Sequence, residues 1–142
     1  MSLVRTLSKV GVTTALAAGL TVAFQPAASA SPVVTVTPST NLEDGTTVQV
    51  AATGLTPNKV FHAAQCAMPV TGTYVCGESS PSFTTDASGS VQFTFVVRRS
   101  FDGDVVGGGH YGTVDCKATV CAIAIGTDHD TDGAGSPPLS FR

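Results

Sequence analysis

Short apolar segments, each followed within a few residues by glycine, proline, asparagine or aspartate, recur along the chain from residue 33 to its end. In the clearest segment, residues 91–97, the odd-numbered positions are Val, Phe, Phe and Val, and the even-numbered positions are mostly polar. This alternation is typical of a strand with one buried face. No segment places apolar residues at helical spacing over three turns. The sequence therefore predicts an all-β domain, either a sandwich or a barrel.

Turn residues divide the chain into the expected strands. Asp44-Gly45 and the stretch from Asp86 to Gly89 are sharp turn signals. The three glycines at 107–109 predict a mobile loop over residues 104–110, and residues 68–72 and 128–136 are expected to be loops. The expected strands are residues 33–37, 46–52, 59–67, 74–75, 82–85, 91–97, 111–116, 122–125 and 139–141.

The first thirty residues have the layout of a secretory signal. Arg5 and Lys9 precede an uncharged stretch, residues 10–24, and the small-x-small sequence that ends at Ala30 is a cleavage site. The uncharged stretch is shorter than the about 20 residues that a membrane-spanning helix needs. We expect cleavage after Ala30, one mature domain at residues 31–142, a secreted extracellular protein, and no membrane association after cleavage.

Charge and composition narrow the classes of partner. Hydrophobic residues make up 42% and charged residues 12% of the chain, a globular rather than a disordered composition. Without Arg5 and Lys9, five basic residues face ten acidic ones, so the mature net charge is −5. An acidic protein repels phosphate backbones, which excludes nucleic-acid binding by electrostatics. We expect a monomer.

The four cysteines, Cys66, Cys76, Cys116 and Cys121, all lie in the mature part. An even count in an exported domain indicates two disulfides, and three pairings are possible. The local pairs Cys66–Cys76 and Cys116–Cys121 are favoured, each stabilising by about 2–3 kcal/mol in the loop-entropy model. A zinc site is disfavoured because the chain has no Cys-x-x-Cys pair and no histidine at ligand spacing. No metal site is predicted.

Candidate catalytic groups are present without a recognisable arrangement. His62, His110 and His129 could act as bases, but no Gly-x-Ser-x-Gly elbow occurs and no spacing assembles a triad. A secreted peptidase is the alternative, and it would require a His–Asp–Ser cluster in three dimensions. The aspartates of residues 128–133 are similar to a calcium loop, yet the closing glutamate and flanking helices are missing, so a solvated turn is favoured.

Several motifs occur in an order that resembles one known family. They are Pro-Ser-Thr-Asn-Leu-Glu-Asp-Gly at 38–45, Gln-Cys-Ala at 65–67, Val-Arg-Arg-Ser-Phe at 97–101, and Gly-Thr-Val-Asp-Cys at 112–116 followed by Cys121. With both cysteine spacings, this set resembles the apoproteins of the enediyne chromoproteins over the whole mature chain. The resemblance implies an immunoglobulin-like, seven-stranded antiparallel β-sandwich with two local disulfides.

The same resemblance implies a function. The family's proteins are antibiotic, antimicrobial apoproteins of actinomycetes that hold an enediyne chromophore non-covalently in a cleft, stabilise it and carry it out of the cell. The chromophore cleaves DNA, so DNA contacts belong to the ligand, and the protein is no enzyme and needs no catalytic cofactor. An orphan β-sandwich that binds another apolar metabolite stays a further alternative.

The resemblance also implies the ligand-binding residues. They are Cys66, Met68, Tyr74, Cys76, Val106, Ala122, Ala124 and Gly126. Met68 stands where neocarzinostatin has a tryptophan. The phenylalanine-rich loop of neocarzinostatin is replaced here by residues 104–109, which are an aspartate, two valines and three glycines. We therefore expect a cleft with a different lining. Because loops splay only at the ends of a sandwich, we expect the cleft between the Cys66–Cys76 loop and residues 104–110, floored by Ala122 and Ala124.

Overall fold

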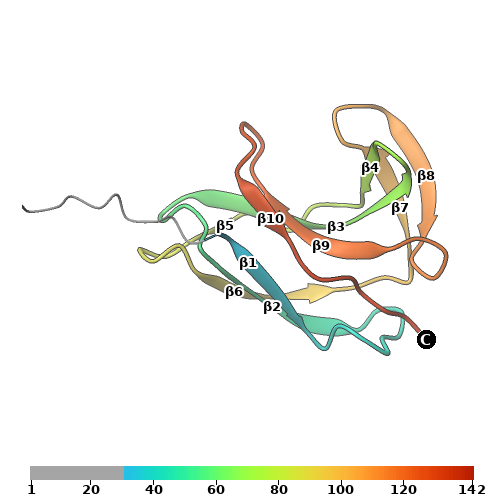
Figure 1. The fold of residues 1–142 in the computed structure, drawn as a ribbon, viewed down its shortest axis with the longest axis horizontal. Coiled ribbons are helices and arrows are strands. Elements are labelled where there is room, and N and C mark those ends of the chain that lie inside the picture. Colours follow the sequence, from blue (N-terminus) through green and yellow to red (C-terminus); the bar gives the residue numbers. More distant parts are fainter. Residues whose placement is uncertain (1–30) are drawn as a thin grey trace, which may run out of the picture.

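The computed structural model describes residues 31–142, and the predicted signal segment with its cleavage site lies outside the described residues. Within this part, the chain forms ten β-strands and no helix, arranged as two antiparallel sheets that face each other (Figure 1). The same residues accordingly include no helix with the length and apolarity needed to span a membrane. The predicted all-β sandwich is confirmed.

The smaller sheet has three strands in the order β1-β2-β6. These are β1 (Val33–Thr37), β2 (Thr47–Thr53) and β6 (Val91–Val96). Each strand alternates between buried and more exposed positions, and Val48 and Val50 of the central strand are fully buried. This sheet follows the period-2 pattern seen in the sequence, with its apolar face toward the other sheet.

The larger sheet has seven strands, with the order β10-β9-β3-β4-β7-β8 and a short β5 that also pairs with β3. Strands β3, β9 and β10 cover the smaller sheet, whereas β4, β7 and β8 form an arm that curves away from it (Figure 1). Their bounds are β3 (Val60–Val70), β4 (Thr73–Cys76), β5 (Phe83–Thr84), β7 (Ser100–Val105), β8 (His110–Asp115), β9 (Cys121–Gly126) and β10 (Gly133–Gly135).

The core lies between the two sheets. In β9, Cys121, Ile123 and Ile125 are buried in it, and the small residues between them face the other side of the sheet. In β3, Phe61 is fully buried toward the core and stacks near Phe83 of β5. The two central strands therefore present an apolar inner face and a separate outer face built from small side chains.

Both favoured disulfides are formed. Cys66–Cys76 links β3 to β4 at directly paired positions, and Cys116–Cys121 closes the short connection from β8 to β9. The described residues contain no free cysteine. The first bridge fixes the root of the arm to the central part of the larger sheet.

The structure corrects several expected boundaries. Residues 104–110 are not one mobile loop, because Asp104 and Val105 belong to β7, His110 begins β8, and the backbone N–H of Val105 donates to Gly109 O at 2.9 Å. Residues 68–70 belong to β3 rather than to a loop. Residues 139–141 contribute only isolated bridges, from Leu139 to Cys121 and from Phe141 to Leu42.

Two strands were not expected at all. Residues 100–105 form β7 although aspartate and glycine are poor strand formers, because the strand pairs with both β4 and β8 and packs Phe101 against the core. Gly103 is required there, since a Cβ would lie 2.7 Å from Val75 Cγ1. The second, β10, is a Gly-Ala-Gly segment within the expected loop 128–136.

Candidate ligand-binding cleft

The floor of the candidate site is the outer face of β3 and β9, the face opposite the core. Small side chains stand directly across from one another on these two strands, with His62 as the one large exception. A surface of methyl groups and glycine leaves the sheet backbone uncovered, so a flat or bulky molecule can approach it closely. The paired positions are His62 with Gly126, Ala64 with Ala124, and Cys66 with Ala122.

Above this floor lies a cleft of about 590 Å³. Its floor residues are on the face of the larger sheet opposite the core, so the cleft lies on the side away from the smaller sheet. One wall is the arm, which contributes Tyr74 of β4 and Val106 of the β7–β8 turn. The opposite wall is β10 with residues 127–132 before it. The volume is within the range of about 300–1,000 Å³ that is usual for small-molecule sites.

The arm wall is held in place by backbone contacts and by the first disulfide. The N–H of Val106 donates to Tyr74 O at 2.8 Å, and Val105 pairs with Val75 one position earlier. Cys76 is bridged to Cys66 of the floor. Tyr74 and Val106 are both exposed although they are apolar, so this wall offers hydrophobic surface that the protein itself leaves uncovered.

Six of the eight residues predicted for the ligand line this cleft, namely Cys66, Tyr74, Cys76, Val106, Ala124 and Gly126. Met68 does not: it lies beyond the disulfide near an irregularity in the β3–β4 pairing and is 53% exposed. Ala122 is on the floor face but past the end of the cleft. Ala124 and Ala64 therefore form the centre of the floor, and the part that these six residues play in binding stays a prediction.

Sequence reasoning missed the second wall. Residues 127–132, expected to be a solvated turn, line the cleft through Asp128, Asp130 and Asp132. The one sequence signal for this wall is Gly133. Without a side chain at Gly133, β10 approaches β9 so closely that a Cβ there would lie 2.3 Å from Ile125 O. Only this close pairing brings the acidic segment over the floor.

The acidic wall is braced by contacts from distant residues. Lys59 Nζ lies 2.7 Å from Asp130 Oδ2 and 3.1 Å from Asp132 Oδ2, and Thr56 Oγ1 donates to Asp132 Oδ2 at 2.5 Å. The Thr127 hydroxyl donates to Asp130 Oδ1. The expected absence of a calcium site stays a prediction, but the described residues form no group of three or more potential metal ligands.

These contacts shift three pKa values. The hydrogen bond from Lys59, followed by that from Thr127, holds the pKa of Asp130 well below its usual value. The pKa of Asp132 is lowered first by the Thr56 hydroxyl and then by Lys59. Hydrogen bonds to Asp130 and Asp132 raise the pKa of Lys59. The wall therefore keeps its charges paired across the neutral pH range.

His62 is the polar group at one end of the floor. Its Nε2 lies 3.1 Å from Asp128 Oδ2, so the imidazole is oriented by the acidic wall. The hydroxyl of Ser80 accepts from Ala63 N and donates to Pro81 O. The other ring nitrogen, Nδ1, lies 3.5 Å from Ser80 O, so both nitrogens of His62 have partners within the protein.

The second His–Asp pairing is on the arm. His110 Nδ1 lies 3.1 Å from Asp104 Oδ1, and its Nε2 lies 3.6 Å from Asp102 Oδ1. Within residues 31–142, neither this pairing nor His62–Asp128 is hydrogen-bonded to a serine hydroxyl, and His129 is exposed. The cluster that a serine peptidase requires is therefore not assembled in the described part of the chain.

Comparison with known proteins identifies the family. A sequence model of the Neocarzinostatin family matches residues 34–141. The chain is 42% identical to macromomycin of Streptomyces macromomyceticus, over 87% of this chain and 88% of that protein. It is 40% identical to the antitumor antibiotic C-1027 apoprotein of Streptomyces globisporus, over 86% and 85%.

The fold agrees with this relationship. The solved structure of macromomycin superimposes with a TM-score of 0.71 and 40% sequence identity, covering 79% of this chain and all of that one. The family model matches nearly the whole described domain, and the sandwich is shared with macromomycin. The chain belongs to the neocarzinostatin family.

Proposed function

We propose that this protein is a secreted antibiotic apoprotein that binds an enediyne-type chromophore non-covalently in the cleft on β3 and β9. The observation that carries the proposal is the cleft itself: about 590 Å³ over a floor of small residues beside Cys66–Cys76, in a member of the neocarzinostatin family. A relative named as an antitumor antibiotic apoprotein supports the same function.

The cleft is suited to protecting a labile molecule. A ligand seated on Ala64 and Ala124 would be shielded from water on its lower face by methyl groups and on one side by Tyr74. The two cysteines at the cleft are joined in a disulfide, so no thiolate is there to attack the ligand. Lys59 is engaged by two carboxylates, which keeps its amine protonated and non-nucleophilic.

Binding in this cleft relies on apolar burial more than on stacking. Tyr74 is the single tyrosine, phenylalanine or tryptophan among the residues that line the cleft. Each aromatic contact is worth about 0.5–1.5 kcal/mol beyond area burial, so a ligand that fits here gains most of its affinity from the floor and from Val106. His62, held between Asp128 and the Ser80 carbonyl, is the one large side chain on the floor and would limit the size of a ligand at that end of the cleft.

In this proposal the protein carries the chromophore and catalyses no reaction. With a net charge of −5 over residues 31–142, the protein repels DNA, so any contact with DNA would be made by the released ligand. The protein would act as a monomer outside the producing cell, where its disulfides are stable.

Native mass spectrometry of protein purified from the producing culture tests this function. We expect a mass above that of residues 31–142 with two disulfides, reverting to the bare mass after extraction with organic solvent. The chain has no tryptophan, so ligand absorbance beyond the tyrosine band would accompany the added mass. Culture-derived protein with the bare mass and only tyrosine absorbance would contradict a carrier function.

A further inference from the structure

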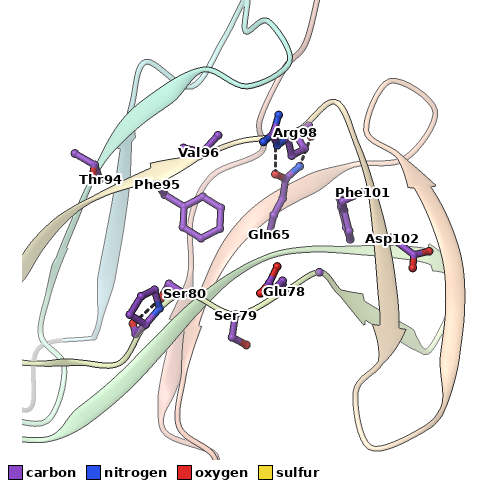
Figure 2. A pocket seen from close by; sticks show the side chains of 12 residues that line it. Gln65, Glu78, Ser79, Ser80, Thr94, Phe95, Val96, Arg98, Phe101 and Asp102 are labelled. Atoms are coloured by element: carbon purple, nitrogen blue, oxygen red, sulfur yellow. Dashed lines mark hydrogen bonds between the residues drawn. The ribbon is translucent and has the colours of Figure 1, made fainter.

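A second groove, which shares one lining residue, Ser79, with the cleft, opens between the two sheets. It has a volume of about 590 Å³ and lies between β6 and residues 77–81. Figure 2 shows the Phe95 ring pointing into this space, while Thr94 and Val96 point away from it. Phe101 of β7 lines the same groove, and both phenylalanines are only partly buried. The sandwich therefore leaves two aromatic rings accessible along this side.

One end of the groove is closed by Gln65, a buried polar side chain. Its Nε2 donates to Arg98 O at 2.6 Å, and its Oε1 accepts from Arg98 N at 2.8 Å (Figure 2). This bond pair ties β3 to Arg98, the second residue after β6, and so links the two sheets. These two hydrogen bonds hold β3 and Arg98 together at this end, so the end of the groove is rigid.

Among residues 31–142, β6 pairs with β2 and with no other strand, so its other side is an edge of the smaller sheet and forms one rim of the groove. Val97 N donates to Thr46 O just beyond the paired region. Because antiparallel pairing alternates, the N–H and C=O groups of Thr94 and Val96 then point away from β2, toward the groove side. A row of unpaired backbone groups on a strand with no charged residue is a template for an added strand.

The opposite rim carries an unpaired charge. Glu78 lines the groove and is exposed, and in the described part of the chain its carboxylate has no ion-pair or hydrogen-bond partner. The other charged lining groups do have contacts: Arg98 Nη1 lies 3.9 Å from Asp44, and Asp102 lies 3.6 Å from His110. Charge complementarity therefore favours a basic group opposite Glu78.

We propose that this groove binds an extended peptide segment of another protein, with alternating apolar side chains and one basic residue, as an added strand on the free edge of β6. Its backbone would pair with Thr94 and Val96. Its inward side chains would contact Phe95 and Phe101, and its basic side chain would pair with Glu78. The inference is independent of the chromophore cleft.

An extended peptide fits the observations better than a second copy of this chain. The groove lies between the β6 edge and residues 77–81, and a single extended strand is the narrowest occupant that could pair with β6 while passing residues 77–81. A small aromatic molecule could contact the two rings, but it would leave the backbone groups of Thr94 and Val96 unpaired. A peptide can contact both phenylalanine rings, pair with the β6 backbone and place a basic side chain beside Glu78.

Nuclear magnetic resonance titration with a synthetic probe tests the proposal. The probe is a capped peptide in which valine alternates with threonine, prepared with lysine at either end. We expect saturable amide shifts at Thr94, Val96 and Glu78, which line the groove and not the cleft, with a Kd below about 1 mM for one of the two versions. No saturation up to that concentration, or shifts confined to Ala64 and Ala124 of the cleft, would overturn the proposal.

Two matched pairs of variants assign the contacts. Thr94→Pro removes an edge N–H while leaving the bonds to β2, and should weaken binding by about tenfold. Its control, Gln92→Pro, lies on the same free edge outside the groove. Glu78→Gln should weaken binding of the lysine peptide by about threefold, and the control Glu43→Gln, equal in charge but distant, should not. Equal effects within either pair would contradict the assigned contacts.

A backbone N-methylated version of the probe keeps the test decisive if Thr94→Pro does not fold. Methylating alternate amides on the pairing side should abolish binding to the unmodified protein, because strand addition requires those donors. Retained binding would rule out an added strand. Sedimentation of the protein alone should give a single monomer at all concentrations, whereas a dimer abolished by Thr94→Pro would assign the edge to a second copy.

Discussion

Ala124 lies at the centre of the cleft floor, directly across from Ala64 on β3 and opposite the space between Tyr74 and Val106. Its small size is what leaves this space open, because the alternation of β9 places Ile123 and Ile125 in the core and Ala124 outside it. A larger side chain here would grow into the cleft and not into the core.

Ala124→Trp should therefore fill the cleft. We expect the affinity for an aromatic hydrophobic probe, anilinonaphthalene sulfonate, to fall by at least about tenfold, with the free energy of unfolding changed by less than about 1 kcal/mol. Fluorescence titration and urea unfolding measure the two quantities. Ala87→Trp, in an exposed turn, controls for binding of the probe to an added indole. Unchanged affinity, or unfolding through overpacking, would place Ala124 outside the cleft.

Gly89 is constrained by both conformation and space. Its φ is +76°, and a Cβ would lie 2.0 Å from Leu55 O. Because Leu55 O is a backbone atom, it cannot move aside as the end of a flexible side chain could. Gly89→Ala should destabilise the domain by more than about 2 kcal/mol in urea unfolding. Gly107→Ala has a similar φ of +75° with open space around it, and should lose only about 1 kcal/mol. Equal losses would show that the steric contact with Leu55 does not matter.

At the scale of elements, the second wall of the cleft depends on Lys59 at the start of the β3 region and on carboxylates some seventy residues later. Carboxyls with a lowered pKa stabilise the folded state fully above their usual pKa of 3.8, and this stabilisation is lost as the pH falls through the lower folded value. The raised pKa of Lys59 contributes fully below 10.5 and is lost as the pH rises through the folded value. The wall should therefore persist between about pH 4 and 10.5.

Replacing Lys59 tests the bracing of this wall. In Lys59→Met, the carboxyl-carbon titrations of Asp130 and Asp132 should move up toward 3.8, because their main shared hydrogen-bond donor is lost. Nuclear magnetic resonance measures both midpoints. Lys117→Met removes the same charge from an exposed turn and should leave the midpoints unchanged. Midpoints that stay low in Lys59→Met would assign the shifts to Thr56 and Thr127 alone.

The sequence was informative where one strand carries its own pattern and weak where a strand depends on its neighbours. Residues 91–97 predicted β6 because their alternation reflects burial on one face. β7 was not predicted, because Gly103 and its flanking aspartates form a strand only through pairing with β4 and β8. β10 was missed for the same reason, and with it the acidic wall of the cleft.

For the whole molecule, the cleft and the groove are consequences of one arrangement. The larger sheet extends beyond the smaller one through its β4–β7–β8 arm (Figure 1). The outer face of that sheet is thereby curved into the cleft, while the free edge of β6 faces the groove. The two disulfides, which the cysteine spacing predicted, link the arm to the central strands at β4 and at the β8–β9 connection. The face of the sheet that carries the cleft depends on how the arm curves, and local sequence patterns could not predict that.

Amide chemical-shift mapping tests the central claim most directly, by comparing recombinant apoprotein with protein purified from the producing culture. A bound chromophore should shift the amides of Ala64, Tyr74 and Ala124 most strongly, with those of Thr94 and Val96 in the groove unaffected. Removing the ligand with organic solvent should return the spectrum to that of the apoprotein. Identical spectra from the two sources, or shifts centred on the groove instead of the cleft, would contradict the assignment of the cleft as the chromophore site.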